Sequence, residues 1–436
     1  MLRLLAMTQP DRQEAKALAK YIDASPSPYH ACKVAAERLD AAGFHALQEL
    51  EAWDQAPGRY YVLRGGSIVA WVLPESATST TGFRIVGAHT DSPNLRIKPK
   101  PDSNAVGVRR LGIEVYGGPL LNSWLDRDLG LSGRACVRSS DGGSEERLFL
   151  MDRAILRVPQ LAIHLHREIR TDGLLLNPQR HMSPIWGLED DTDRGFRQLL
   201  AEELDVAPND ILGWDAMCHD TTPSRLIGDG EPFLSAPRLD NLCSSHCALS
   251  AMIARLEQGD PDKISVVCLF DHEEIGSTSR AGADSPFLRD LLERACLARG
   301  GSHEDFQRAL ADSICVSADM AHATHPNYVD KHDKDHRLAM NGGPVIKLNT
   351  NMRYASEPST EAHFQLVCER AEVPFQKWAN RNDLACGSTI GPITASNLGI
   401  RTVDIGNPQL AMHSAREMCG SLDPGYLVRA LTVFLD

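Results

Sequence analysis

The chain has 436 residues, of which 42% are hydrophobic and 24% are charged, and its formal net charge is −13. This length and composition favour two globular domains, and the negative charge argues against a nucleic-acid backbone as partner. No apolar run in the sequence approaches the length that spans a membrane. Eleven cysteines without C-x-x-C pairs are typical of reduced thiols in a cytoplasmic protein.

The N-terminal region begins with a short apolar stretch, MLRLLAM, that superficially resembles a secretion signal. Its apolar part is too short and a polar stretch follows at once, so we expect a cytoplasmic protein that starts at Met1 or Met7. Apolar periodicity over residues 11–42, interrupted by the sequence SPSP, predicts two helices. Strand-like segments bounded by Gly and Pro follow, at residues 60–63, 67–72 and 83–86.

The middle of the chain, from about residue 96 to 235, has a different pattern of polar, apolar and turn residues. Short segments of alternating polarity lie among Gly and Asp turns there, and an acidic helix is expected at residues 191–205. After this section strands again alternate with helices. The sequence therefore predicts an α/β protein in which residues 1–95 and 236–436 form one domain and residues 96–235 form an inserted, mostly β domain.

The most informative stretch is a run of five apolar residues, 266–270, followed by Asp271-His272-Glu273-Glu274. Such a run is typical of a buried parallel strand, and open α/β sheets bind ligands where these strands end. Two adjacent glutamates at that point can divide the chemistry, one holding a metal ion and the other moving a proton. The alternative is a charged turn without function, which is the commoner meaning of such a short motif by itself.

Four further candidates lie at the ends of predicted strands or in loops beside them: His89, Asp240, Asp319 and His413. Asp91, two residues after His89, can accept a hydrogen bond from the second ring nitrogen of a metal-bound imidazole. By itself, a His-x-Asp pair is more often an ordinary loop, and an aspartate before a helix is more often its N-cap.

With Glu274, these residues supply two imidazoles and three carboxylates, a set that suits zinc, manganese or cobalt. Five ligands are too many for one tetrahedral catalytic zinc with an open position, but they fit two metal ions if one carboxylate bridges. Glu273 is then free to act as a general base toward water. The sequence thus predicts a two-metal hydrolase.

Two other residues have open interpretations. His164, in the sequence LAIHLH, is compatible with a packed core histidine as well as with a functional one. Lys347, in a predicted strand at residues 345–349, is typical of an edge strand with its ammonium group in water. The glycine-rich turn at residues 386–392 lacks the Lys-Ser/Thr ending of a phosphate loop, so no nucleotide site is expected.

The motifs GAHTDSP, RLDN, DHEEIGS, SADMAHATHPNY, GPVIK and AMHSAREM resemble those of the aspartyl aminopeptidase family of metallopeptidases. They are long and collinear, and the resemblance covers the chain from about residue 10. It implies a three-layer αβα metallopeptidase domain with a mixed sheet, interrupted by a second domain used for dimer contacts. It also implies a tetrahedral dodecamer built from dimers.

The resemblance further implies two zinc ions per subunit, with cobalt or manganese as substitutes, and peptide substrates that begin with Asp or Glu. The residue roles that it implies are His89 and Asp319 on one ion, Glu274 and His413 on the other, Asp240 bridging, Glu273 as general base and acid, Asp91 orienting His89, His164 reaching a neighbouring subunit's active site, and Lys347 receiving the acidic side chain.

Two other functions remain open at this point. A related two-metal carboxypeptidase or deacylase would use the same ligands, and a carboxypeptidase would also need a cationic group for the substrate's C-terminal carboxylate. An inactive assembly or cargo scaffold that kept the fold would normally have lost ligands, and none is lost in this sequence.

Overall fold

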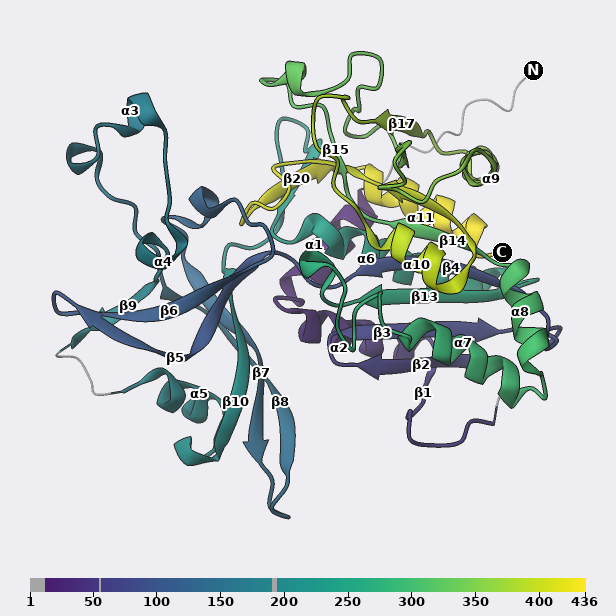
Figure 1. Cartoon of the computed structure of the whole chain (residues 1–436), viewed down its shortest axis with the longest axis horizontal. Helices are drawn as coiled ribbons and strands as arrows, with labels where there is room; N and C mark the ends of the chain where they lie inside the picture. Colours follow the sequence, from purple (N-terminus) through teal and green to yellow (C-terminus); the bar gives the residue numbers. More distant parts are fainter. Residues whose placement is uncertain (1–11, 55, 190–193) are drawn as a thin grey trace.

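The computed structural model describes residues 12–54, 56–189 and 194–436. The alternative start residues Met1 and Met7, and residues 191–193 of the expected acidic helix, lie outside these ranges. Figure 1 shows the two main parts of the molecule, a large sheet covered by helices on the right and a second sheet on the left.

The largest sheet is a mixed sheet of nine strands. In sheet order these are β1 (His45–Ala46), β2 (Gly58–Arg64), β3 (Ser67–Leu73), β13 (Ile264–Phe270), β4 (Phe83–His89), β14 (Ile314–Ala318), β18 (Arg401–Gly406), β16 (Val345–Leu348) and β17 (Gln376–Ala379). Strands β13, β4, β14 and β18 pair in parallel, whereas β3 pairs antiparallel to β13. The carboxyl ends of the four parallel strands therefore meet at one edge of the sheet, where α/β proteins bind ligands.

Helices cover both faces of this sheet. One face carries α1 (Gln13–Asp23), α2 (Pro28–Ala41), α6 (Leu239–Arg255), α9 (Pro358–Arg370) and α11 (Asp423–Phe434). The other face carries α7 (Phe287–Ala298), α8 (His303–Ala311) and α10 (Ile390–Leu398).

Strand β13 contributes alternate side chains to the two apolar cores on either side of the sheet, Val267 and Leu269 to one and Val266 and Cys268 to the other. Because both of its faces are buried, the strand is apolar at every position except Ser265, rather than alternating. The three-layer αβα organisation with a mixed sheet is thereby confirmed.

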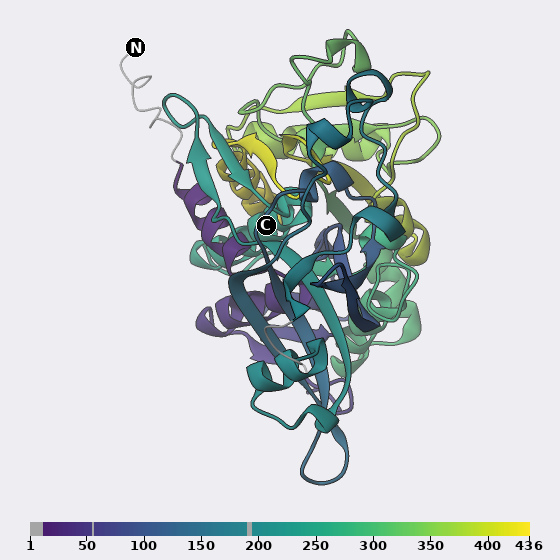
Figure 2. The ribbon, with the colours of Figure 1, turned by 90° about the vertical axis from the view of Figure 1, so that its left-hand side faces the viewer.

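The second sheet has six strands, and each pairing in it is antiparallel. In sheet order they are β8 (Ser144–Leu156), β7 (Leu129–Arg138), β10 (Ile211–Asp220), β5 (Asn94–Ala105), β6 (Val108–Tyr116) and β9 (Ile185–Leu188). The sheet has its own apolar core, to which α5 (Phe196–Leu204) contributes, and two short helices, α3 (Ile169–Asp172) and α4 (Pro178–His181), lie between β8 and β9. Figure 2 views the molecule from the side of this sheet. The expected mostly β insertion is therefore present.

A third, small sheet joins distant parts of the chain. Its strands are β11 (Arg225–Ile227), β12 (Phe233–Ala236), β20 (Glu417–Gly420), β19 (Pro408–Leu410) and β15 (Ala321–His322). Strands β11 and β12 fall almost entirely within residues 96–235, yet β12 pairs with β20 near the C-terminus. The exact domain boundaries, 96 and 235, stay a prediction.

Strand β16 differs from the edge strand suggested for Lys347. It lies between β18 and β17, and Lys347 is only 3% exposed. The edge-strand interpretation is therefore wrong, because pairing with strands far along the chain encloses a segment whose own sequence suits an edge. Among the described residues, no helix combines the length and apolar character needed to cross a membrane.

Candidate active site

Glu273 and Glu274 follow the carboxyl end of β13, in a single 3₁₀ turn, η6 (Glu273–Ile275). The backbone N–H groups of both glutamates donate to the carboxylate of Asp91, each over 3.1 Å. His272, just before the turn, has a positive φ of 67°. A buried carboxylate on the neighbouring strand's loop therefore fixes the turn that presents both glutamates.

Asp91 also contacts the imidazole of His89, with Asp91 Oδ1 3.3 Å from His89 Nδ1. The backbone carbonyl of Asp91 lies 3.0 Å from the same nitrogen. Tyr116 Oη donates a 2.6 Å hydrogen bond to Asp91 Oδ2. Burial by itself would raise the pKa of Asp91, but the hydrogen bonds from His89 and Tyr116 hold that pKa below its usual range. Asp91 thus stays ionised, and His89 is turned so that its Nε2 faces the neighbouring carboxylates.

His89, Asp240 and Asp319 form the first group of potential metal ligands, with ligand atoms within 4.8 Å of one another. His89 Nε2 lies 3.3 Å from Asp240 Oδ1 and 3.7 Å from Asp319 Oδ1. His89 is the last residue of β4 and Asp319 directly follows β14, the strand paired with β4. Parallel pairing therefore brings these two side chains to the same edge of the sheet.

Asp240, Glu274 and His413 form a second group that shares Asp240 with the first. His413 Nε2 lies 3.5 Å from Asp240 Oδ2 and 3.4 Å from Glu274 Oε2. His413 Nδ1 donates to the carbonyl oxygen of Gly118 over 3.0 Å, which leaves Nε2 to face the acids. Glu273 adjoins the cluster, with Oε2 3.9 Å from His89 Nε2. The structure thus brings together all six residues that the sequence suggested for the metal site and the general base.

Asp240 lies in the first turn of α6, where its backbone and that of Asn241 depart from helical geometry. The N-cap residue of α6 is Arg238, and the side chain of Asp240 faces His89 and His413, so the N-cap interpretation is wrong. Glu417 Oε2 accepts from the N–H of Asp240 over 3.0 Å, and Glu417 Oε1 accepts from the N–H of His413 over 2.7 Å. One carboxylate thus positions two candidate ligands.

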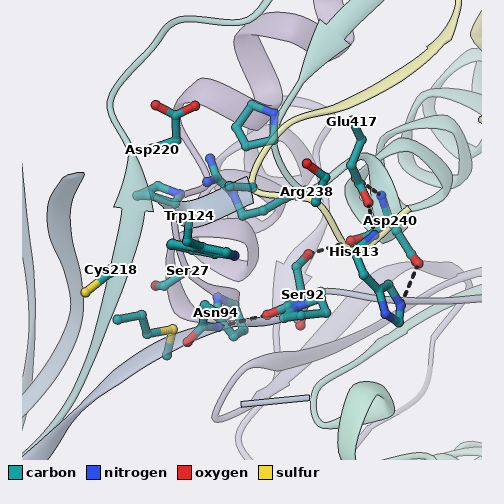
Figure 3. Close-up of a pocket in the computed structure, with 18 residues that line it drawn as sticks. Ser27, Ser92, Asn94, Trp124, Cys218, Asp220, Arg238, Asp240, His413 and Glu417 are labelled. Atoms are coloured by element: carbon teal, nitrogen blue, oxygen red, sulfur yellow. Dashed lines mark hydrogen bonds and ion pairs between the residues drawn. The ribbon is translucent and has the colours of Figure 1, made fainter. Parts of the chain in front are cut away.

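Figure 3 shows Asp240, His413 and Glu417 on one side of a pocket that Arg238 and Trp124 also line. Glu417 was missed in the sequence, although it belongs to the AMHSAREM motif, four residues after His413. No local signal separates it from a surface glutamate, because one of its two partners, Asp240, is 177 residues away.

The donor set fits divalent cations. Asp240 Oδ1 and Glu274 Oε1 are buried and have no hydrogen-bond partner among the described residues. Burial, followed by the charge of Asp240, raises the pKa of Glu274 well above its usual range. Burial and the neighbouring carboxylates raise the pKa of Glu273 to about 8. Such an excess of buried negative charge is costly unless a cation neutralises it, and two imidazoles with three carboxylates suit zinc.

Lys347 lies beside the cluster. Its Nζ is 3.9 Å from Asp319 Oδ2 and 5.3 Å from the centre of the Tyr354 ring. The exposed side chain of His322, three residues after Asp319, packs edge-on against Trp378 at a ring distance of 6.3 Å and lines a surface pocket with it. Sequence reasoning had assigned no role to His322.

His164 lies elsewhere, in the short turn η2 (Ile163–Leu165) within the long connection from β8 to β9. It is exposed, so the packed-core interpretation is wrong. Its neighbours Leu161, Ile163 and Leu165 are also exposed, by 57%, 42% and 75%. None of the contacts described for this chain joins His164 to the ligand cluster of its own subunit.

Known proteins resemble this chain over almost its whole length. A family model described as "Aminopeptidase I zinc metalloprotease (M18)" matches residues 21–435. A curated relative from Streptomyces coelicolor, "Probable M18 family aminopeptidase 2", is 51% identical over 428 residues, which cover 98% of each chain.

Two solved structures extend this likeness to the fold. "Cryo-EM structure of the Ape4 and Nbr1 complex" contains a chain that is 38% identical, with a TM-score of 0.94 and coverage of 97% of this chain and 85% of that chain. "Structure of S. cerevesiae mApe1 dodecamer" is 29% identical, with a TM-score of 0.84 and coverage of 97% and 96%. The chain therefore belongs to the M18 family of zinc metalloaminopeptidases, the aspartyl aminopeptidase family that its motifs resemble.

Proposed function

We propose that the protein is a two-metal aminopeptidase that removes an N-terminal Asp or Glu from peptides. The observation that carries the two-metal proposal is the Asp240 carboxylate. One of its oxygens faces His89 Nε2 at 3.3 Å and the other faces His413 Nε2 at 3.5 Å. A carboxylate between two imidazoles on opposite sides suits a bridge between two cations, with Asp319 and Glu274 completing the ligand set.

The chemistry that bound zinc supplies is Lewis acidity, which polarises a carbonyl and makes water more acidic. Glu273 supplies the proton transfer. Its backbone is fixed by Asp91, and its carboxylate adjoins the cluster. Glu273 accepts a proton from the attacking water and delivers it to the leaving amine.

Lys347 supports the acidic specificity. Its ammonium group is buried next to the cluster, and Asp319 is its one ion-pair partner among the described residues. A second carboxylate that arrives with the substrate is attracted to this charge, whereas a basic side chain is repelled. Trp378, which pairs with Lys347 across β16 and β17, lines a surface pocket with His322, and we infer that this pocket receives the substrate's first side chain.

The assembly that we propose is a homo-oligomer, a tetrahedral dodecamer built from dimers, in which His164 completes the active site of a neighbouring subunit. Its support is the exposure of His164 among exposed leucine and isoleucine side chains, which favours burial against another copy of the chain. A relative of this fold is described as a dodecamer. The inserted sheet, at residues 96–235, would provide the dimer contacts.

A panel of peptides tests the function. Enzyme stripped of metal and reloaded with zinc, cobalt or manganese is assayed on Asp-, Glu-, Ala- and Leu-peptides, on an N-acetylated Asp-peptide and on its C-terminal amide. We expect activity that depends on metal, favours Asp and Glu, tolerates the amide and disappears on N-acetylation. Cleavage of the N-blocked peptide with loss of activity on the amide would instead identify a carboxypeptidase, with Lys347 holding the C-terminal carboxylate. Full activity without metal would refute the two-metal proposal.

A further inference from the structure

Tyr116 connects the inserted sheet to the active site of the same subunit. It is the last residue of β6 in the six-stranded sheet, whereas Asp91 follows β4 in the nine-stranded sheet. The 2.6 Å hydrogen bond from Tyr116 Oη to Asp91 Oδ2 therefore crosses from one sheet to the other. Both side chains are buried, so this hydrogen bond is shielded from bulk water.

Each oxygen of Asp91 has two partners, and every one of them leads to the ligand cluster or to Tyr116. Oδ1 faces His89 Nδ1 at 3.3 Å and accepts from the N–H of Glu273. Oδ2 accepts from the N–H of Glu274 and from Tyr116 Oη. The orientation of this carboxylate sets both an imidazole ring and the turn that carries the two glutamates. Tyr116 is the one partner that comes from outside the nine-stranded sheet and its loops.

Tyr116 is itself held in place. The guanidinium of Arg96 stacks over its ring, 3.6 Å from the ring centre, and Arg96 Nη1 lies 3.1 Å from Asp215 Oδ1. Tyr29, in α2 on the nine-stranded sheet, donates its hydroxyl hydrogen to Asp215 Oδ2. The six-stranded sheet is thus also attached through Asp215, and the Tyr116 hydroxyl cannot move away from Asp91 without breaking the stack.

We propose that Tyr116 is a positioning residue of the active site, through which the inserted sheet of the same subunit holds Asp91 and so aligns His89, Glu273 and Glu274. This inference rests on the proposed two-metal function. It gives the inserted sheet a role inside each active site, separate from any contact between subunits.

The substitution Tyr116→Phe removes the hydroxyl and keeps the ring under Arg96. Tyr61→Phe is the control, because the Tyr61 side chain is buried to a similar extent and its hydroxyl donates over 2.9 Å to a carboxylate away from the cluster, that of the exposed Asp40. Both purified variants are stripped and reloaded with Co²⁺. We measure the visible absorption of bound cobalt, which depends on ligand geometry, its affinity by competition with a chelator, the melting temperature without metal, and kcat and KM on an Asp-peptide.

For Tyr116→Phe we expect an altered cobalt spectrum and a loss of up to about 10–100-fold in cobalt affinity or in kcat, the effect of changing a direct partner of a metal ligand, which here is Asp91. Tyr61→Phe should match the wild type in spectrum and affinity, even if both variants melt at a similarly lowered temperature. A Tyr116→Phe spectrum and affinity equal to those of Tyr61→Phe would overturn the inference.

A second variant covers the case in which Tyr116→Phe does not fold. Arg96→Gln keeps the hydroxyl but removes the stacked charge, and it should shift the cobalt spectrum in the same direction by a smaller amount. No shift in this variant would also contradict the inference. If instead the wild type binds cobalt with a Tyr116-dependent spectrum but cleaves no N-terminal residue, the proposed function fails and the positioning role stands.

Discussion

The proposed acidic specificity rests on Lys347, and the substitution Lys347→Met tests it. Methionine is about as long as lysine and keeps the packing of β16 between β18 and β17, while the charge is lost. Lys377→Met is the matched control, because Lys377 lies on the neighbouring strand β17 and pairs with the Glu361 carboxylate over 2.7 Å.

The structure separates two effects of this change. Asp319, 3.9 Å from the ammonium group, loses a charge partner whatever the substrate is, and at an effective dielectric of about 20 such a pair interacts by about 4 kcal/mol. An acidic substrate loses a second interaction. Removing one member of a buried charge pair costs roughly 2–5 kcal/mol, which is a factor of tens to thousands at about 1.4 kcal/mol per factor of ten.

The assay is kcat/KM on Asp-, Glu-, Ala- and Leu-peptides for the wild type and both variants. The loss of the Asp319 partner affects all four substrates and cancels in the ratio of acidic to neutral peptides. We expect that ratio to fall by tens to thousands of fold in Lys347→Met and to stay unchanged in Lys377→Met. An equal loss on all four peptides would refute the reasoning, because Lys347 would then act only through Asp319 or the fold.

Three further predictions concern catalysis, assembly and stability. Glu273→Gln should keep both metal ions but lower kcat by about two to four orders of magnitude, whereas Glu274→Gln should weaken metal binding. Metal analysis and kcat of the two variants check this. The reverse pattern would make Glu273 the metal ligand and Glu274 the general base. His164→Ala should bind metal normally, and its kcat should fall by a factor that corresponds to about 3 kcal/mol. Mixed oligomers of His164→Ala and Glu273→Gln subunits should regain activity. No recovery in verified mixed oligomers would show that His164 does not act in the neighbouring subunit's active site. Burial, and to a smaller extent the charge of Arg238, lowers the pKa of His219 to about 3. The folded state therefore binds this proton less readily than the unfolded chain does, and the stability of the fold decreases as the pH drops below about 6.5. His219→Leu, which replaces ring nitrogens that have no hydrogen-bond partner among the described residues, should flatten the acid side of the stability–pH curve by about 1.4 kcal/mol per pH unit; an unchanged slope would contradict the assignment.

Local sequence was enough to predict the residues that gather at the ligand cluster. The apolar run of β13 ends directly before Asp271 and His272, which precede Glu273, and His89 and Asp319 also stand at the ends of buried strands. Parallel strands share one carboxyl edge, so side chains at the ends of these strands converge once the strands pair. Their convergence follows from the direction of the strands alone. The motifs identified the family because each of them is a continuous stretch of sequence.

Contacts between distant segments had no such local signal. The segment around Lys347 by itself predicts an edge strand, because nothing in it shows that β16 lies between β17 and β18. Glu417 accepts a hydrogen bond from the backbone N–H of Asp240, which is 177 residues away. Tyr116 meets Asp91 only because β6 of the second sheet ends beside the loop after β4. Sequence alone identified the groups that gather at the ligand cluster, since residue type and spacing are local properties. The packing of one sheet against another decided what holds those groups in place, because that depends on pairings which no short segment encodes.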